Sequence, residues 1–447
     1  MEQVNLYSTI FHDQIQQREY ATGLIPDVRA VENHVVNLYP QKRYQTFEGF
    51  GAALTESAGY TLSRMSEEKR REVLEACYGK SGLGYTLGRV PMDSCDFSLG
   101  NYCAVQPAET SGFGDFSLKR DAQYIQPLLR EALQTAGKPL KLLMSPWSPP
   151  GFMKDTGMRN GGGHLKKECY QAYADYIVKY LLEYGKLGFH IGMLTVQNEP
   201  LAVQLWDSCE YTAGEEKEFL KNHLYPTLQK NGLGGVELYL WDHNKERVYE
   251  RACEILDDET KDMVAGVAYH WYSGDHFEAL QMVREDFPSL KLMHSEGCVE
   301  LAYGLGDGGN GMEHAERYAH DMIGDMNHGM NSWIDWNLAL DENGGPSHVE
   351  NFCDAPIRCD MSADTVTYQP TFYAIARFSR YIQPGAVRIG CSCYSTDMEM
   401  TAFQNTDGTL AAVVLNPRER REVNLRLTGK TARLFLPPQS ISTIVVQ

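Results

Sequence analysis

Hydrophobic residues along this chain form short strand-like runs that alternate with longer helical patterns. Several of these runs are almost continuously apolar, as strands of a parallel sheet are when helices cover both of its faces. The predicted strands lie at residues 45–54, 85–92, 140–146, 191–196, 236–242, 264–272, 290–296 and 332–340.

Helical spacing fills the intervals between the predicted strands. One long interval repeats its large apolar residues every three or four positions, which places them on one helical face. These residues are Tyr170, Tyr173, Ile177, Leu181 and Tyr184. Further helices are expected over 66–78 and 368–382, where start and stop residues frame the pattern. Eight strand–helix rounds predict an α/β fold, a (β/α)8 TIM barrel with enlarged loops; an open doubly wound sheet is the alternative.

The pattern changes after residue 384, where six short strand-like runs follow one another without helical spacing. They predict a side β-sandwich. Two similar runs, 4–10 and 34–40, precede the barrel and are expected to complete this sandwich. The expected organisation is 1–44 for N-terminal strands of the sandwich, 45–383 for the catalytic barrel and 384–447 for the C-terminal part of the sandwich.

The balance of charges narrows the choice of partners. The 447 residues carry a formal net charge of −18, which repels phosphate backbones and anionic lipid heads. We therefore expect a neutral or cationic small molecule as the partner, no nucleic acid and no stable membrane insertion; the oligomeric state is left open. Eleven scattered cysteines and an N-terminal segment without a continuous apolar run predict a reducing, cytoplasmic location.

Two glutamates stand where predicted strands end. Glu199 follows the fourth strand in the segment LTVQNEP, and Glu296 ends the seventh in LMHSEGC. Active sites of (β/α)8 barrels are built at the carboxyl ends of the strands, so the two side chains are expected to share one site. Glycoside hydrolysis uses one carboxylate as the nucleophile and one carboxylic acid that protonates the leaving oxygen. The pair therefore predicts a glycosidase.

Other strand ends supply groups that suit a sugar. Arg89 closes the second strand, and a guanidinium beside Glu296 would keep that carboxylate anionic. Aromatic rings match the flat C–H faces of a sugar, while acids, amides and imidazoles match its hydroxyl groups. Residues of these kinds at or after the strand ends are Asp96, Trp147, His270, Tyr272, Trp336 and Asn337.

Each of these residues also has a structural explanation. A glutamate before a proline can end a turn, Arg89 can pair with an acid inside the barrel, and tryptophans near strand ends can be packing residues. A non-catalytic carbohydrate-binding barrel and a metal-dependent barrel hydrolase therefore stay open as alternatives. We expect no cofactor and no metal, because the histidine and cysteine spacings do not match metal sites. The glycine-rich segment 304–309 is expected to be a loop, because its aspartate would repel a pyrophosphate.

Seven longer segments of the barrel region are distinctive both in sequence and in order. They are FEGFGAALTESA, LGRVPMDSCDFS, SPWSPPGFMK, NGGGHLK, TVQNEP, HSEGCV and DWNLALDENGGP. Between residues 47 and 346 these segments resemble glycoside hydrolase family 30, the family of lysosomal glucosylceramidase and its bacterial β-glycosidase relatives. The resemblance implies a barrel with a side sandwich and a retaining mechanism.

The resemblance also implies roles for individual residues. Glu199 resembles the acid/base of the family, and Glu296 resembles its nucleophile. Asn198 resembles the residue that binds the 2-hydroxyl group of the sugar, whereas Arg89 and Tyr272 resemble the partners that orient the nucleophile. The implied sugar pocket contains Asp96, Trp147, Trp336 and Asn351, with His270 nearby.

Departures from the family concern the leaving-group side. The segment QLWDSC (204–209) places Trp206 where mammalian members have a tyrosine, and His348 occupies a position that is often tryptophan. The resemblance therefore does not fix the aglycone. The expected function is a retaining β-glycosidase that hydrolyses small-molecule β-glucosides, of glucosylceramidase or β-glucosidase type. A β-xylosidase and an endo-β-1,6-glucanase are the alternatives within the family.

Overall fold

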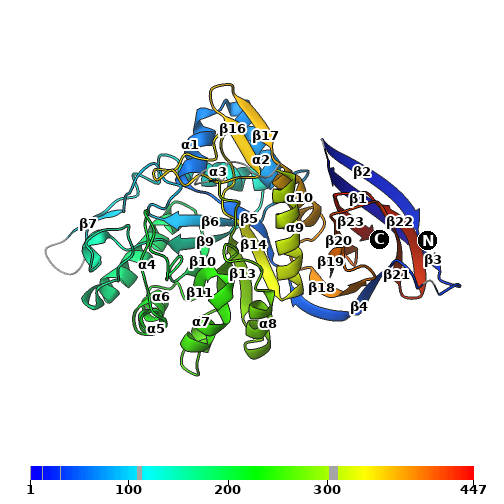
Figure 1. Ribbon diagram of the computed structural model, residues 1–447. Coiled ribbons are helices and arrows are strands. Elements are labelled where there is room, and N and C mark those ends of the chain that lie inside the picture. Colours follow the sequence, from blue (N-terminus) through cyan, green and yellow to red (C-terminus); the bar gives the residue numbers. More distant parts are fainter. Residues whose placement is uncertain (1, 13, 31, 108–112, 302–310) are drawn as a thin grey trace.

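The computed structural model describes residues 2–447 apart from 13, 31, 108–112 and 302–310. A (β/α)8 barrel lies beside a β-sandwich that holds both chain termini (Figure 1). These two parts confirm the predicted fold class. None of the described helices has the length and apolar character that crossing a bilayer requires. The glycine-rich loop expected at 304–309 lies outside the described residues.

Eight parallel strands close the barrel, each paired with the next along the chain and the last paired with the first. All eight predicted strands are present, and most of their residues are buried, as the apolar runs predicted. The strands are β5 (Gly49–Ala53), β6 (Leu87–Met92), β9 (Lys141–Pro146), β10 (Ile191–Thr195), β11 (Glu237–Asn244), β12 (Gly266–His270), β13 (Lys291–Glu296) and β14 (Met330–Asp335).

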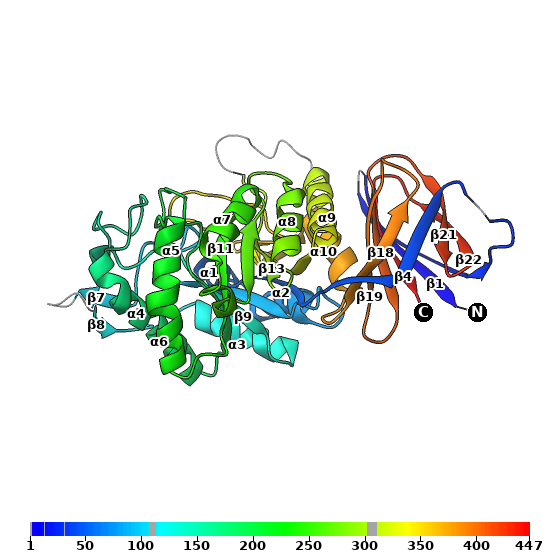
Figure 2. The same ribbon diagram turned by 90° about the horizontal axis from the view of Figure 1, so that it is seen from below.

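Helices cover the outside of the barrel (Figure 2). The face predicted from the spacing of tyrosines is buried on the helix that follows β9. The helices are α1 (Glu56–Arg64), α2 (Glu67–Tyr78), α3 (Ile125–Ala136), α4 (Tyr170–Lys186), α5 (Ala213–Phe219), α6 (Tyr225–Lys230), α7 (Val248–Ile255), α8 (Phe277–Asp286), α9 (Met312–Asn327) and α10 (Pro370–Ser379). Small sheets in the loops are formed by β7 (Val105–Pro107), β8 (Phe113–Phe116), β15 (Leu340–Asp341), β16 (Ile357–Asp360) and β17 (Thr365–Tyr368).

One sheet of ten strands forms the sandwich around its own apolar core. Its strands are β1 (Gln3–Phe11), β2 (Ile15–Gly23), β3 (Ile25–Pro26), β4 (Val35–Thr46), β18 (Val387–Cys393), β19 (Glu399–Gln404), β20 (Leu410–Asn416), β21 (Arg421–Leu427), β22 (Lys430–Leu436) and β23 (Ser440–Val446). Strand β1 pairs with β23, and β4 pairs with β18 and β21, so both ends of the chain build one domain, as predicted. The sequence did not indicate β2, because this edge strand is largely polar and exposed.

The sandwich docks on α9 and α10. The imidazole Nδ1 of His320 on α9 lies 2.8 Å from a carboxylate oxygen of Glu399 on β19. The Asn327 side-chain amide donates to the Met400 carbonyl oxygen at 2.9 Å. These contacts tie the outer helices of the barrel to the sheet, away from the ends of the barrel strands.

Several element boundaries differ from the expectation, most of all around the first, sixth and eighth barrel strands. Strand β4 runs to Thr46 and still pairs there with β18, so the first barrel strand begins only at Gly49. Strand β12 ends at His270, and β14 ends at Asp335. Tyr272 and Trp336 therefore follow their strands, where the backbone is free to turn their side chains toward the barrel mouth.

Candidate active site

The predicted site residues come together at the carboxyl ends of the barrel strands. Nine of them line one small pocket of about 120 Å³: Asp96, Trp147, Asn198, Glu199, Trp206, Tyr272, Glu296, Trp336 and Asn351. Three others do not line it: Arg89 and His270 are fully buried and contact the two glutamates, whereas Asn337 is buried and accepts from the Thr55 hydroxyl at 3.3 Å.

Glu296 is held by two fixed donors. Arg89 Nη1 donates to one carboxylate oxygen at 2.6 Å, and the Tyr272 hydroxyl donates to the other at 2.9 Å. Both partners are those that the family resemblance implied. Burial raises the pKa of Glu296, and His270 and Arg89 oppose that rise. The charge-assisted contact with Arg89 favours the ionised form of the carboxylate.

Arg89 links several buried polar side chains next to the pocket. Its guanidinium donates to Asn198 Oδ1 at 2.9 Å and to Asp242 Oδ2 at 2.8 Å, and its Nε donates to Ser145 Oγ at 3.1 Å. The Asn198 oxygen faces Arg89, so the amide group of Asn198 is left for a ligand in the pocket. A buried guanidinium is stable only when its donors are satisfied in this way.

Asp242 is a site residue that the sequence reasoning missed. It lies near the end of β11, is fully buried, and accepts from Arg89, His270 and the Ser295 hydroxyl. Burial would raise the pKa of Asp242, but Arg89 and His270 outweigh burial and hold the pKa well below its usual range. The available signal was a charged residue at the end of a barrel strand, the same signal that identified Arg89 and Glu296.

Glu199 sits in a backbone conformation that non-glycine residues rarely adopt. Its φ angle is +47°, and its N–H donates to the Asp242 carbonyl oxygen at 2.9 Å. One carboxylate oxygen lies 3.0 Å from His270 Nδ1 and 3.7 Å from His243 Nδ1. Burial would raise the pKa of Glu199, but the two histidines outweigh it and lower the pKa.

His270 bridges two carboxylates. Its Nδ1 faces Glu199, and its Nε2 lies 3.1 Å from Asp242 Oδ1. Burial lowers the pKa of His270, but the charge of Glu296 and the hydrogen bonds to Asp242 and Glu199 outweigh burial and raise the pKa to about 9. His270 therefore carries a proton at neutral pH and presents it to Glu199.

The two glutamates lie close enough to act on one atom. One carboxylate oxygen of each, together with a nitrogen of His270, falls within 4.8 Å of the others. Carboxyl groups about 5–5.5 Å apart are typical of retaining glycosidases, whereas inverting enzymes separate them by about 6.5–9.5 Å. The spacing matches the retaining geometry.

One wall of the pocket combines stacked rings with an unsatisfied acid. Trp147 and Trp336 stack with ring centroids 5.1 Å apart, and the Arg89 guanidinium lies over both. Asn351 donates to Asp96 Oδ2 at 2.9 Å, whereas Asp96 Oδ1 is buried and has no partner among the described residues. Burial and the charge of Glu296 raise the pKa of Asp96 to about 8. This acid is placed to bind a sugar hydroxyl group.

The pocket is also lined by residues that the sequence reasoning did not single out. They are Gln204, His243, Asn244, Glu300 and Cys353. Each lies in a loop after a barrel strand or at a strand end, where polar residues are common, so sequence position alone did not distinguish them.

Glu199, His270 and Glu296 also have the spacing of a metal site. Arg89 and Tyr272 already occupy the oxygens of Glu296, and two cationic neighbours, Arg89 and His270, oppose a dication there. The described residues contain a second such group, formed by His294, Asp321 and Asp325. The ammonium of Lys245 already contacts both of its aspartates, at 2.5 and 3.0 Å.

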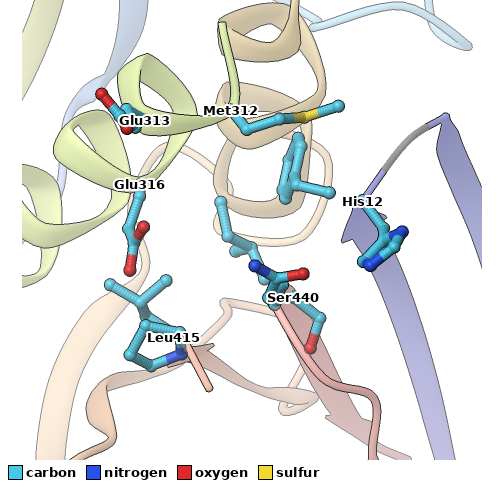
Figure 3. A pocket seen from close by; sticks show the side chains of 10 residues that line it. His12, Met312, Glu313, Glu316, Leu415 and Ser440 are labelled. Atoms are coloured by element: carbon cyan, nitrogen blue, oxygen red, sulfur yellow. The ribbon is translucent and has the colours of Figure 1, made fainter. Parts of the chain in front are cut away.

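A larger cavity of about 450 Å³ lies between the barrel and the sandwich (Figure 3). Met312, Glu313 and Glu316 at the start of α9 form one side, and residues of the sandwich such as Leu415 and Ser440 form the other. None of the predicted site residues lines this cavity. The larger cavity is therefore not the candidate active site, which is identified by its paired carboxylates.

Comparisons with known proteins identify the families of both domains. The model of the glycosyl hydrolase family 30 TIM-barrel domain matches residues 47–382, and that of the family's β-sandwich domain matches residues 385–444. Lysosomal acid glucosylceramidase from Mus musculus is 32% identical over 432 residues, which cover 92% of this chain and 83% of that protein.

Two solved structures superpose over almost the whole chain. SrfJ from Salmonella typhimurium has a TM-score of 0.95 and 38% identity, and the endo-β1,6-glucanase BT3312 has a TM-score of 0.87 and 28% identity. In each case the match covers 99% of both chains. This chain belongs to glycosyl hydrolase family 30, a family of retaining glycosidases.

Proposed function

We propose that this enzyme is a retaining β-glucosidase in which Glu296 is the nucleophile and Glu199 is the acid/base. One observation carries the proposal: the two carboxylates approach within 4.8 Å, while Arg89 and Tyr272 hold only Glu296. The fixed donors suit a permanent anion, whereas the histidine beside Glu199 suits a group that gains and loses a proton.

In the first step Glu296 attacks the anomeric carbon and forms a glycosyl ester. The bond from that carbon to the leaving oxygen breaks, and this oxygen takes a proton from Glu199. In the second step Glu199 accepts a proton from water, and the water oxygen attacks the same carbon. The ester bond then breaks, the Glu296 carboxylate is released, and the sugar keeps its original configuration.

His270 supplies the proton that Glu199 must deliver. In the free enzyme the proton rests on His270, because the pKa of His270 is raised to about 9 and that of Glu199 is lowered. The 3.0 Å contact lets the proton move to Glu199 when a substrate covers the pair and excludes water. Asp242, on the other ring nitrogen, holds the imidazole in the required orientation.

A glucoside with a non-sugar aglycone is the proposed substrate. The small pocket, the stacked tryptophans and the unpartnered oxygen of Asp96 support one hexose bound from its non-reducing end. The similarity to a protein named glucosylceramidase, at 32% identity, supports glucose as that hexose. An endo-β-1,6-glucanase is the second candidate, because BT3312 bears that name and matches 99% of the chain.

A panel of aryl β-glycosides tests this proposal. We expect cleavage of the 4-nitrophenyl β-glucoside, a much lower rate with the xyloside, and no release of oligosaccharides from β-1,6-glucan. Proton NMR during early turnover should show β-glucose before mutarotation. Xyloside preference or digestion of β-1,6-glucan would redirect the substrate assignment, and α-glucose as the first product would overturn the mechanism.

We also propose that the enzyme works in a reducing compartment. All eleven cysteines are free thiols, including the neighbouring pair Cys298 and Cys353 beside the site. Fractionation of cells that make the protein tests this point: we expect it in the cytoplasmic fraction, and recovery from an oxidising compartment would contradict the proposal.

A further inference from the structure

Glu300 is a carboxylate at the edge of the pocket that the proposed mechanism does not use. It follows the nucleophile strand β13 by four residues and pairs through its backbone with Cys353. The flanking hydrogen bonds run from Leu301 N to Phe352 O at 2.8 Å and from Asp354 N to Val299 O at 2.7 Å. The loop that carries Asn351 therefore fixes the position of Glu300 relative to the pocket.

The carboxylate of Glu300 has no hydrogen bond or ion pair within the part of the chain that the structure describes. Partial burial raises its pKa, and the charge of Glu199 raises it further, whereas Arg317 lowers it. No ion pair joins Glu300 to Arg317, whose guanidinium lies over the Trp271 ring at 4.6 Å. Glu300 therefore lines the same pocket as Glu199, the residue that protonates the leaving oxygen, without a direct cationic partner among the described residues.

The described lining of the pocket is rich in carboxyl groups. It contains Asp96, Glu199, Glu296 and Glu300, and neither lysine nor arginine. His243 holds less positive charge at neutral pH than an ordinary histidine, because burial lowers its pKa. Three of the carboxyl groups have roles toward the sugar and the glycosidic bond, and Glu300 has none.

We propose that Glu300 selects leaving groups that carry a positively charged amine close to the glycosidic oxygen, that is, β-glucosides of amino alcohols. A neutral hydroxyl group would leave the repulsion between Glu300 and Glu199 in place, whereas an ammonium ion relieves it. The inference rests on the proposed β-glucosidase function and adds the chemical class of the aglycone.

Matched substrates test the role of Glu300. The probes are 2-aminoethyl and 3-aminopropyl β-glucoside, each compared with its hydroxyalkyl analogue by kcat/KM at pH 7. The wild type should prefer the amines, and Glu300→Gln should reduce this preference by about fivefold, mainly through KM, as expected for a partly exposed ion pair. Comparing the ratio between enzymes cancels the different leaving abilities of the alcohols.

Two further variants complete the design. Glu300→Lys should reverse the preference, while Glu254→Gln, which removes the same charge from the exposed face of α7, should leave it unchanged. Added salt should weaken the preference of the wild type. Equal ratios in the wild type and in Glu300→Gln would overturn the assignment of Glu300 alone. Failure of the wild type to cleave any of the four glucosides would overturn the proposed function and this inference with it.

Discussion

The two glutamates share one pocket, but their surroundings differ. Glu296 is held by an arginine and a tyrosine, neither of which titrates near neutral pH. Glu199 is held by His270, a group whose proton is exchangeable and whose pKa is about 9. One carboxylate is therefore held by donors that favour its anion, and the other belongs to a pair that shares a proton.

This contrast separates two functions that act on the same bond. A nucleophile must be ionised in every cycle, and permanent donors achieve this without depending on pH. An acid/base must give a proton in one step and take one in the next, so its neighbour has to titrate as well. Asp242 links the two sides, because it accepts from both Arg89 and His270.

The largest loss of activity is expected when Glu296 is replaced. Glu296→Ala should lower kcat by on the order of 10⁴-fold or more, because it removes the atom that forms the covalent intermediate. Added azide should react with an activated aryl β-glucoside in this variant and give the α-glucosyl azide by a single inversion. Near-native turnover would exclude Glu296 as the nucleophile; circular dichroism checks that the variant is folded.

Replacing the proton-sharing glutamate should give an effect that depends on the substrate. Glu199→Ala should slow cleavage of alkyl glucosides by on the order of 10³-fold, because their alkoxide cannot leave without a proton. Formation of the glycosyl ester from dinitrophenyl glucoside should be almost unaffected, and azide should yield the β-glucosyl azide. Equal losses with both substrates would argue against Glu199 as the acid.

Replacing Arg89 should lower both the stability and the activity of the enzyme. Arg89→Met leaves Asp242 and Glu296 buried without their cation, at a cost of about 3–5 kcal/mol in the free energy of unfolding. Without the arginine the pKa of Glu296 rises, so the acidic limb of kcat/KM should move to higher pH.

A surface arginine provides the control for this variant. Arg433→Met removes an exposed ion pair with Glu422 and should leave the free energy of unfolding almost unchanged. Urea unfolding measures both variants. Equal losses of stability in the two variants would refute the claim that Arg89 holds the buried carboxylates in place.

The smallest effect is expected on the pH dependence of stability when His270 or His243 is replaced. The folded-state pKa of His270 is raised from 6.5 to about 9, so its stabilisation is fully present below pH 6.5 and disappears as the pH rises through 9. The stability lost in His270→Gln should follow the same course, with a difference on the order of a few kcal/mol at low pH.

His243 is the matched control, because burial lowers its pKa instead of raising it. His243→Gln should gain stability relative to the wild type as the pH falls below 6.5, the opposite trend. Urea unfolding from pH 5 to 9 measures both. Parallel trends for the two variants would contradict the different protonation states assigned to these residues.

The barrel and its two glutamates could be predicted because each follows from a local pattern. Buried parallel strands are apolar runs, and their carboxyl ends mark the active face. Glu296 ends such a strand, and Glu199 follows one. Arg89 lies within β6, which continues to Met92, and therefore does not close the second strand as expected. Strand β2 could not be predicted, because an exposed edge strand carries no apolar alternation and is defined by its partner β1.

The missed site residues depended on information that is not local. Asp242 resembles any acid at a strand end until Arg89 and His270 are seen to converge on it from other strands. The positive φ of Glu199 and the position of Glu300 in the pocket lining likewise depend on the tertiary structure. A single sequence indicates which residues face the barrel mouth but not which of them meet.

The most direct test of the double-displacement account is to trap its covalent intermediate. Incubation with 2-deoxy-2-fluoro-β-glucosyl fluoride should inactivate the enzyme, because the fluorine slows the hydrolysis of the ester more than its formation. Mass spectrometry of the digested protein should place the sugar on the peptide that contains Glu296. The absence of an adduct while activity continues, or an adduct on another residue, would contradict the assignment of Glu296 as the nucleophile.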